Sequence, residues 1–204
     1  MPNWCENYIT ISGDEKVIDQ IVDILKTDGK DDNFFETLIG RNPEVLSEDY
    51  ENQGWYEANI SWYGTKWDIS IQEVLNRMSY EPGQISFTCE TAWAPPVGFM
   101  KNVSEIYNVE VSGQFYEPGM DFAGQQSYEN GVLIDDFEYT YEEGKYFMDR
   151  DYFWESLESN LEYYVDSEMD VEEVKENFSF MDDEDIQEVV SIYEELKSQN
   201  EPRD

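Results

Sequence analysis

The chain has 204 residues, of which 48 are acidic, 12 are basic and none is histidine, so its formal net charge is −36. No run of ~18 or more apolar residues is present and no basic-then-apolar leader opens the chain, so the sequence predicts a cytoplasmic protein without a membrane span. The lack of histidine excludes Ser-His-Asp and Cys-His catalysis and His-containing zinc sites, and the charge disfavours direct binding to nucleic acid.

The first 139 residues alternate between strand-like and helix-like stretches. Strands are expected where apolar and β-branched residues alternate, and helices where apolar residues recur every three or four positions. The expected elements are a strand at 4–12, a helix at 14–27, a short apolar segment at 34–39, a strand at 58–63, a segment at 69–79 that suits a helix better than a strand, a strand at 84–91, a helix from Pro95 to Tyr107, a strand at 110–117, and a hairpin of 122–128 and 132–139. Asn130-Gly131 between the last two strands is a strong hairpin signal.

Without the 69–79 segment, this order is strand, helix, strand, strand, helix, strand, followed by a hairpin. It is typical of the ferredoxin-like split βαβ fold, in which both helices lie on one face of an antiparallel sheet. The content of 40% apolar and 16% aromatic residues is enough for a hydrophobic core. The predicted fold class is therefore α+β, with a ferredoxin-like domain and an added hairpin over residues 1–139.

Residues 140–204 predict an acidic α-helical extension. They hold 22 acids and 5 bases, against 26 acids and 7 bases in residues 1–139. Five acids recur at steps of four, three, four and four residues, which places them on one stripe of a helix, and the apolar residues of that helix form a separate stripe. The acids of this stripe are Asp151, Glu155, Glu158, Glu162 and Asp166. A second helix is expected from Asp170, with Glu173 as its capping-box partner, and a third from Asp182.

The two cysteines, Cys5 and Cys89, lie in apolar, strand-like stretches. They form no CxxC pair and are too few for a four-thiolate zinc site, so we expect buried reduced thiols, with a disulfide open if the two strands are neighbours. Acidic clusters at 28–36 and 182–185 lack the spacing and central glycine of an EF-hand loop. No metal and no cofactor is therefore expected.

Four distinctive motifs occur in the first 139 residues. They are Met1-Pro2-Asn3-Trp4-Cys5-Glu6-Asn7, Gly64-Thr65-Lys66-Trp67-Asp68, Thr91-Ala92-Trp93-Ala94-Pro95-Pro96 and Tyr116-Glu117-Pro118-Gly119-Met120-Asp121-Phe122-Ala123-Gly124. In this order they resemble the YubB-like ferredoxin-like domain family of phages and conjugative plasmids. The resemblance implies the split βαβ fold and an origin on a mobile genetic element, but no established activity and no catalytic residues. Residues 69–83 and the acidic helices after 140 depart from the family pattern.

A candidate ligand corner combines tryptophans with one lysine and one aspartate. It consists of Trp4, Lys66, Trp67, Asp68 and Trp93. In an enzyme, Lys66 and Asp68 would form an acid–base or substrate-anchoring pair in an aromatic pocket. In a structural corner, the tryptophans would be buried and Lys66 would pair with Asp68 or with a helix end. No base–nucleophile pair stands out, so the structural corner is favoured and the chain is predicted not to be an enzyme.

The spacing of the acids on the acidic stripe favours one class of function, the imitation of DNA. Side chains one helical turn apart lie ~5–6 Å from one another, and each DNA strand places one phosphate per ~3.4 Å of axis, so a rigid carboxylate row can imitate part of a phosphate row. The sequence therefore favours a mobile-element-encoded inhibitor, a DNA mimic, that binds a basic nucleic-acid-binding protein in the host bacterial cytoplasm. Restriction or CRISPR defence effectors are the target class that the resemblance implies. The predicted partner-binding residues are Asp151, Glu155, Glu158, Glu162, Asp166, Asp170, Glu172, Glu173 and Glu176, with Trp154 or Tyr163 as an aromatic anchor if exposed.

Two other classes of function stay open. One is an interaction scaffold that forms homo-oligomers through sheet edges or the aromatic surface. The other is a small-molecule-binding protein that uses the tryptophan-lined corner near Lys66. An ordinary solvated helix face also explains the stripe, because surface acids keep proteins soluble.

Overall fold

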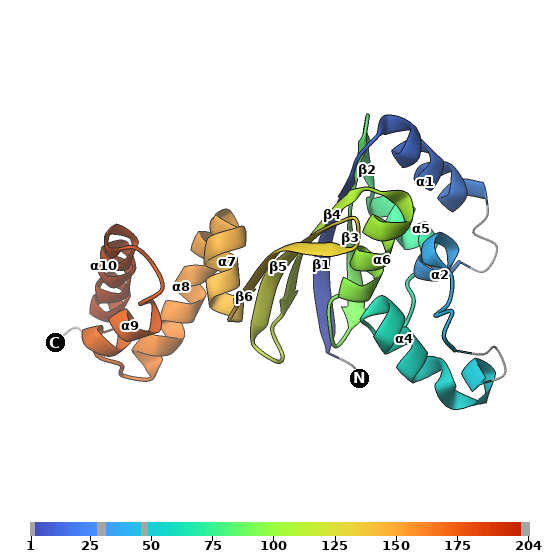
Figure 1. Ribbon diagram of the computed structural model, residues 1–204. Helices are drawn as coiled ribbons and strands as arrows, with labels where there is room; N and C mark the ends of the chain where they lie inside the picture. Colours follow the sequence, from blue (N-terminus) through green and yellow to red (C-terminus); the bar gives the residue numbers. More distant parts are fainter. Residues whose placement is uncertain (1–2, 28–31, 46–48, 201–204) are drawn as a thin grey trace. The chain divides into compact units, whose positions relative to one another are not determined.

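The computed structural model describes residues 3–27, 32–45 and 49–200 (Figure 1). The chain divides into two compact units, which we call the sheet unit, residues 1–141, and the helical unit, residues 142–204. Each unit has a hydrophobic core of its own. The predicted division lies between residues 139 and 140, and the observed one lies between Tyr141 and Glu142.

A six-stranded antiparallel sheet with strand order β2-β3-β1-β4-β5-β6 organises the sheet unit. The strands are β1 (Trp4–Ser12), β2 (Ser79–Glu81), β3 (Gln84–Ala92), β4 (Glu110–Glu117), β5 (Phe122–Glu129) and β6 (Val132–Tyr139). Strands β1 to β4, with a helix after β1 and another after β3, make the β-α-β-β-α-β unit of the ferredoxin-like fold. The hairpin β5–β6 extends this sheet beyond β4, so the predicted α+β fold and its added hairpin are confirmed.

The helices of the sheet unit lie on one side of the sheet (Figure 1). In the described residues they are α1 (Glu15–Thr27), α2 (Phe34–Ile39), a single π-helical turn η1 (Tyr50–Gly54), α4 (Trp55–Tyr63), α5 (Ile71–Arg77) and α6 (Val97–Tyr107). Alternate residues of β1, including Ile9 and Ile11, are buried on the helix side. The core centres on aromatic rings, since Phe35 of α2 lies 4.5 Å from Phe99 of α6 between ring centroids. Phe34 packs against Phe87 of β3 at 5.2 Å.

The predicted strand at 58–63 is wrong, because these residues form the end of helix α4. The aromatic and β-branched residues of this stretch suit a strand, but tertiary contacts decide its conformation. The indole N–H of Trp62 and the hydroxyl of Tyr63 both donate to the carbonyl of Gly40. Gly64 then ends the helix in the left-handed conformation, at φ 89°.

The ambiguous segment at 69–79 contains helix α5, as its apolar spacing favoured. Ser70 caps this helix by accepting a hydrogen bond from the backbone N–H of Glu73. The three-residue edge strand β2 follows directly and was not predicted. A strand this short is barely visible in a sequence, since it carries one alternation of side chains.

The β5–β6 hairpin turns at Asn130-Gly131, as predicted. Both residues have positive φ, 51° and 74°, which is the signature of a type I′ turn. The N–H of Gly131 donates to Oγ of Ser104 on α6 at 2.9 Å. The positive φ of 74° favours glycine at position 131, where a Cβ atom would also lie 2.9 Å from Oε2 of the Glu105 side chain. The tip of the hairpin is thereby fastened to α6.

In the described residues the helical unit contains four helices, the first of which begins one residue before the unit, at Tyr141. They are α7 (Tyr141–Met148), α8 (Arg150–Asp166), α9 (Val171–Asn177) and α10 (Asp183–Asn200). Its core joins α8 to α10 through the buried side chains of Phe153, Leu157 and Leu161 on α8 and Val189 and Tyr193 on α10. The predicted helical character of this region is confirmed.

A buried carboxylate links three helices of this unit. Asp185 of α10 is 7% exposed and accepts a hydrogen bond from the Tyr146 hydroxyl of α7 at 2.6 Å. The guanidinium of Arg150, at the start of α8, forms an ion pair with the same carboxylate. Burial and the bond to Asp185 together raise the pKa of Tyr146, which extends the pH range in which its hydroxyl donates to Asp185 above that of an ordinary tyrosine.

We expect Asp185→Ala to lower the free energy of unfolding of the helical unit by about 1–3 kcal/mol, because it removes the shared acceptor of Tyr146 and Arg150. Urea denaturation followed by circular dichroism at 222 nm measures this change. Glu188→Ala is the matched control, since Glu188 is an exposed acid on the same helix. Equal stability of the two variants would show that the network contributes nothing.

Candidate functional site

Five carboxylates form a row along the outside of α8. This carboxylate row consists of Asp151, Glu155, Glu158, Glu162 and Asp166, and all five side chains are exposed. The opposite side of the same helix is buried in the core of the helical unit. At a rise of 1.5 Å per residue the row spans about 22 Å. The predicted separation of acidic and apolar stripes is confirmed, and packing of the apolar stripe fixes the direction in which the row points.

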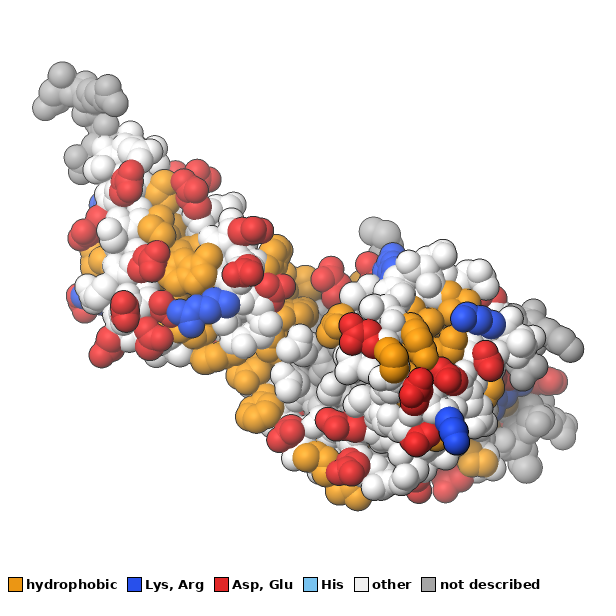
Figure 2. Space-filling model, turned by 90° about the horizontal axis from the view of Figure 1, so that it is seen from above, with side chains coloured by type: hydrophobic (Ala, Val, Ile, Leu, Met, Phe, Trp, Pro, Cys, Tyr) orange, Lys and Arg blue, Asp and Glu red, His pale blue; other side chains and the backbone are white. Residues whose placement is uncertain are grey.

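The basic side chains of the helical unit do not neutralise the row. Residues 142–200 hold 20 acids and 4 bases. Lys145 pairs with Glu142 at 2.7 Å, Arg150 pairs with the buried Asp185, and Lys175 pairs with Glu172 at 2.8 Å. Among the described residues no ion pair involves the row. Figure 2 shows acidic side chains spread over the visible face of the helical unit.

Three of the four predicted contact acids on α9 stabilise that helix. Asp170 accepts from the backbone N–H of Glu173, and Glu173 accepts from the N–H of Asp170, so the predicted capping box is present. Glu172 is the ion-pair partner of Lys175. These acids and Glu176 are exposed, but the local bonds limit how far the first three can reorient toward a partner.

An aromatic side chain lies beside the carboxylate row. Tyr163 is 66% exposed and Tyr152 is 48% exposed, and both belong to α8. Trp154 is half-buried, with its ring 5.4 Å from that of Phe153. Of the two predicted anchors, Tyr163 therefore meets the condition of exposure.

The tryptophan corner exists, but its tryptophans are on the surface. Trp4, Trp67 and Trp93 are 47%, 38% and 45% exposed, so their expected burial is wrong. The ring centroids of Trp4 and Trp67 are 6.2 Å apart, and the backbone N–H of Trp93 donates to the carbonyl of Asn3 beside β1. Lys66 Nζ lies 4.4 Å from the ring centroid of Trp67, a cation–π contact, instead of pairing with Asp68.

Asp68 has a structural role in the sheet unit. Its carboxylate accepts hydrogen bonds from the backbone N–H groups of Phe35, Glu36 and Ile69, at 2.7, 2.8 and 2.7 Å. It thus caps the start of α2, on which the aromatic core depends. Burial raises the pKa of Asp68, and the three donors oppose that rise. The predicted acid–base pair with Lys66 is not formed.

We expect Asp68→Ala to destabilise the sheet unit by about 1–3 kcal/mol, because the N–H groups at the start of α2 lose their acceptor. Chemical denaturation followed by tryptophan fluorescence measures the effect, with Asp23→Ala on the surface of α1 as the control. A variant as stable as the wild type would contradict the structural role, and Asp68 would then again be a candidate residue of the ligand corner.

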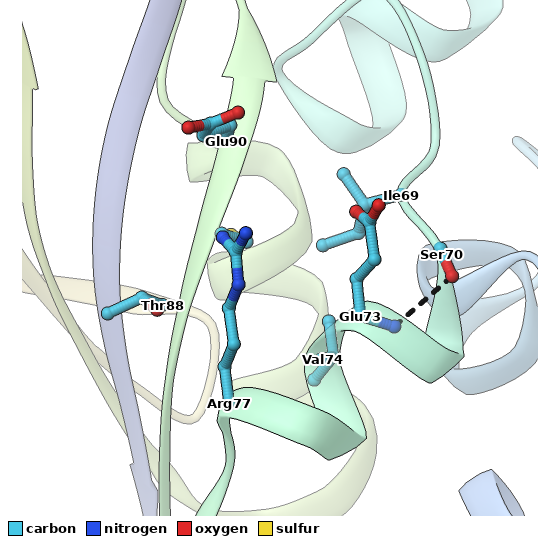
Figure 3. Close-up of a pocket in the computed structure, with 8 residues that line it drawn as sticks. Ile69, Ser70, Glu73, Val74, Arg77, Thr88 and Glu90 are labelled. Atoms are coloured by element: carbon cyan, nitrogen blue, oxygen red, sulfur yellow. Dashed lines mark hydrogen bonds between the residues drawn. The ribbon is translucent and has the colours of Figure 1, made fainter.

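A small cleft lies between α5 and β3 (Figure 3). It is lined by Ser70, Glu73 and Arg77 on the α5 side and by Cys89 and Glu90 on the strand side, among others. Its volume of about 10 Å³ corresponds to one water molecule. The cleft therefore offers no room for an organic ligand.

The two cysteines lie on neighbouring strands and are free thiols. In the register of β1 and β3, Cys5 is opposite Thr91 and Cys89 is opposite Asn7, which makes the cysteines diagonal neighbours. Burial raises the pKa of each thiol to about 12. At neutral pH the nucleophilic thiolate form is therefore scarce.

We expect both thiols of the native protein to resist Ellman's reagent at pH 8 and to react fully in 6 M guanidinium chloride, because unfolding restores their usual pKa and access. Absorbance at 412 nm counts the thiols that have reacted. Rapid reaction of the native protein would contradict the burial of Cys5 and Cys89.

The described residues contain no group of three or more Cys, Asp or Glu side chains arranged to hold a metal ion. Of the acidic cluster at 28–36, Asp28 and Asp31 lie outside the described residues. In the described part of the chain, no helix has both the length and the apolar character that a membrane crossing needs.

Residues 63–193 match the model of a protein family described as the ferredoxin-like domain in Api92-like protein. This match covers more than half of the chain and extends from α4 of the sheet unit into α10 of the helical unit. Among solved structures, the crystal structure of a protein Api92 from Yersinia pseudotuberculosis is similar at 10% identity, over 68% of this chain and 98% of that one, with a TM-score of 0.39. No curated protein matches the chain.

Proposed function

The chain belongs to the family of Api92-like proteins with a ferredoxin-like domain, and within this family we propose that it is a non-enzymatic inhibitor of a basic nucleic-acid-binding protein. The carboxylate row of α8 occupies positions in the partner that DNA phosphates would otherwise take. The observation that carries this proposal is the set of five exposed acids on one face of a helix whose other face is fixed in a core.

The dimensions of the row suit this role. Five carboxylates over about 22 Å correspond to one negative charge per ~5.5 Å, and a DNA strand has one phosphate per ~3.4 Å of axis. A cationic groove lined by flexible Lys and Arg side chains tolerates this difference, because such side chains adjust their reach. Tyr163 adds an exposed aromatic contact beside the charges, of the kind that dominates the energy of interfaces.

The net charge of −36 supports the same role at longer range. A field of this strength steers a cationic partner toward the protein and raises the association rate at low salt. The finer family assignment, to the YubB-like proteins of phages and conjugative plasmids, rests on the four sequence motifs. A mobile-element origin would make host defence effectors, such as restriction or CRISPR proteins, the natural targets in the bacterial cytoplasm.

We expect the triple variant Glu155→Gln, Glu158→Gln, Glu162→Gln to bind its partner at least about tenfold more weakly, since three charge contacts are lost while helix propensity is kept. The partner is first captured from bacterial lysate on immobilised wild-type protein and eluted with duplex DNA. Its affinity for each variant and for DNA is then measured by fluorescence anisotropy between 50 and 300 mM salt.

The matched control is Glu184→Gln, Glu188→Gln, Glu195→Gln, which removes the same charge from exposed positions of α10. Equal losses in the two triple variants would mean that overall charge acts, not the row. A partner that DNA does not displace would refute mimicry.

The exposed tryptophans of the corner favour a second candidate function, an interaction scaffold. A scaffold would appear as a salt-tolerant oligomer on a sizing column.

A further inference from the structure

The outer edge of strand β6 is the longest exposed edge of the sheet. Among the described strands β6 pairs with β5 alone, and it forms one end of the sheet. The other end, β2, is only three residues long. Natural sheets protect their edges with short strands, prolines, charged side chains or β-bulges, because an open row of N–H and C=O groups can pair with another strand. β2 is protected by its length, whereas β6 has eight residues and no proline, and its protection consists of one β-bulge and the charges of Asp135, Asp136 and Glu138.

The side chains of β6 are also exposed to an unusual degree. Val132, Leu133, Ile134 and Phe137 are between 44% and 60% exposed. A β-bulge interrupts the ladder where Ser127 and Tyr128 of β5 face β6. Beyond the bulge, the ladder from Asp135 to Glu138 is regular, so the backbone there keeps the geometry that a further strand needs.

The acids of β6 determine which strand can join it. Asp136 and Glu138 project to one face of the sheet, opposite Gln126 and Gly124, and Asp135 and Phe137 project to the other. A second copy of β6 would place acids against acids, which destabilises a strand pair. A strand with Lys or Arg at alternate positions would instead place bases beside Asp136 and Glu138 and apolar side chains beside Phe137.

We propose that the β6 edge binds an extended segment of a partner protein, with Lys or Arg at every second position and β-branched residues between them, as an added strand of the sheet. The main-chain ladder provides affinity, and the acids select for a basic strand. This inference does not rest on the proposed function, because β6 belongs to the sheet unit and the carboxylate row belongs to the helical unit.

The probe is the acetylated and amidated peptide Thr-Lys-Val-Lys-Val-Lys-Val-Thr, titrated into the full-length ¹⁵N-labelled protein. We expect shifts and hydrogen-exchange protection at the amides of residues 132–138. The variant Asp135→Asn, Asp136→Asn, Glu138→Gln should bind about tenfold more weakly, because it removes the two cross-strand ion pairs of Asp136 and Glu138 and the nearby charge of Asp135. Its side chains keep the oxygen atoms that accept from Ser127 and Gln126.

Two controls separate strand addition from nonspecific attraction to an acidic protein. A peptide of the same sequence with N-methylated valines keeps its charge and loses backbone donors, so it should leave the β6 amides unprotected. The triple Gln variant of α8 should bind the unmodified peptide as the wild type does. If this variant loses as much affinity as the β6 variant, or if the methylated peptide binds equally well, the proposal is overturned.

A second copy is the competing occupant of the edge. Dimerisation of the free protein at low micromolar concentration, with protected β6 amides, would overturn the choice of a basic partner. Should the triple β6 variant fold poorly, Glu138→Lys is the replacement, because no hydrogen bond or ion pair involves the Glu138 side chain in the described residues. This single reversal should also weaken binding of the peptide.

Discussion

Repulsion among carboxylates is the constraint under which the whole chain folds. With a net charge of −36, close approach of the chain to itself carries a cost that apolar burial must offset. The apolar side chains are buried in two separate cores, one in each unit. In the described residues, Arg41, Lys145, Arg150 and Lys175 each pair with an acid, and Arg150 pairs with the buried Asp185. The remaining acids stay on the surface, where water and ions screen them.

This division leaves different kinds of surface on the two units. On the helical unit, Lys145, Arg150 and Lys175 pair with acids outside the carboxylate row, so among the described residues no ion pair neutralises the five acids of the row. On the sheet unit, apolar and aromatic side chains reach the surface at the tryptophan corner and along β6. A charged helix face acts at a distance and depends on salt, whereas an open strand edge acts only on contact. The two surfaces therefore suit successive stages of one association or two different partners.

The sequence predicts the parts of the fold that local rules govern. Strand β1, the Asn130-Gly131 turn, the capping box at Asp170 and the stripe on α8 follow from periodicity and turn chemistry, and each is found where expected. Residues 58–63 were predicted as a strand from their aromatic and β-branched side chains, but they lie in a helix whose Trp62 and Tyr63 donate to the carbonyl of Gly40, 22 and 23 residues earlier in the sequence. The same holds for two other contacts between residues far apart in the sequence. Trp4 contacts Trp67, and Asp68 caps α2 by accepting from the N–H of Phe35, and both contacts form only when the chain folds. A site formed by such long-range contacts cannot be predicted from local patterns in the sequence.

The bond between Gly131 and Ser104 has a consequence for the hairpin that it fastens. A strand that is tied down at its turn has already lost its conformational entropy before any other molecule arrives. Recognition at such an edge is a docking event rather than coupled folding, and its affinity is not reduced by the free energy of ordering the receptor strand. Gly131, which adopts the positive φ of 74° that the turn requires, thereby helps to keep the edge of β6 ordered along residues remote from the turn.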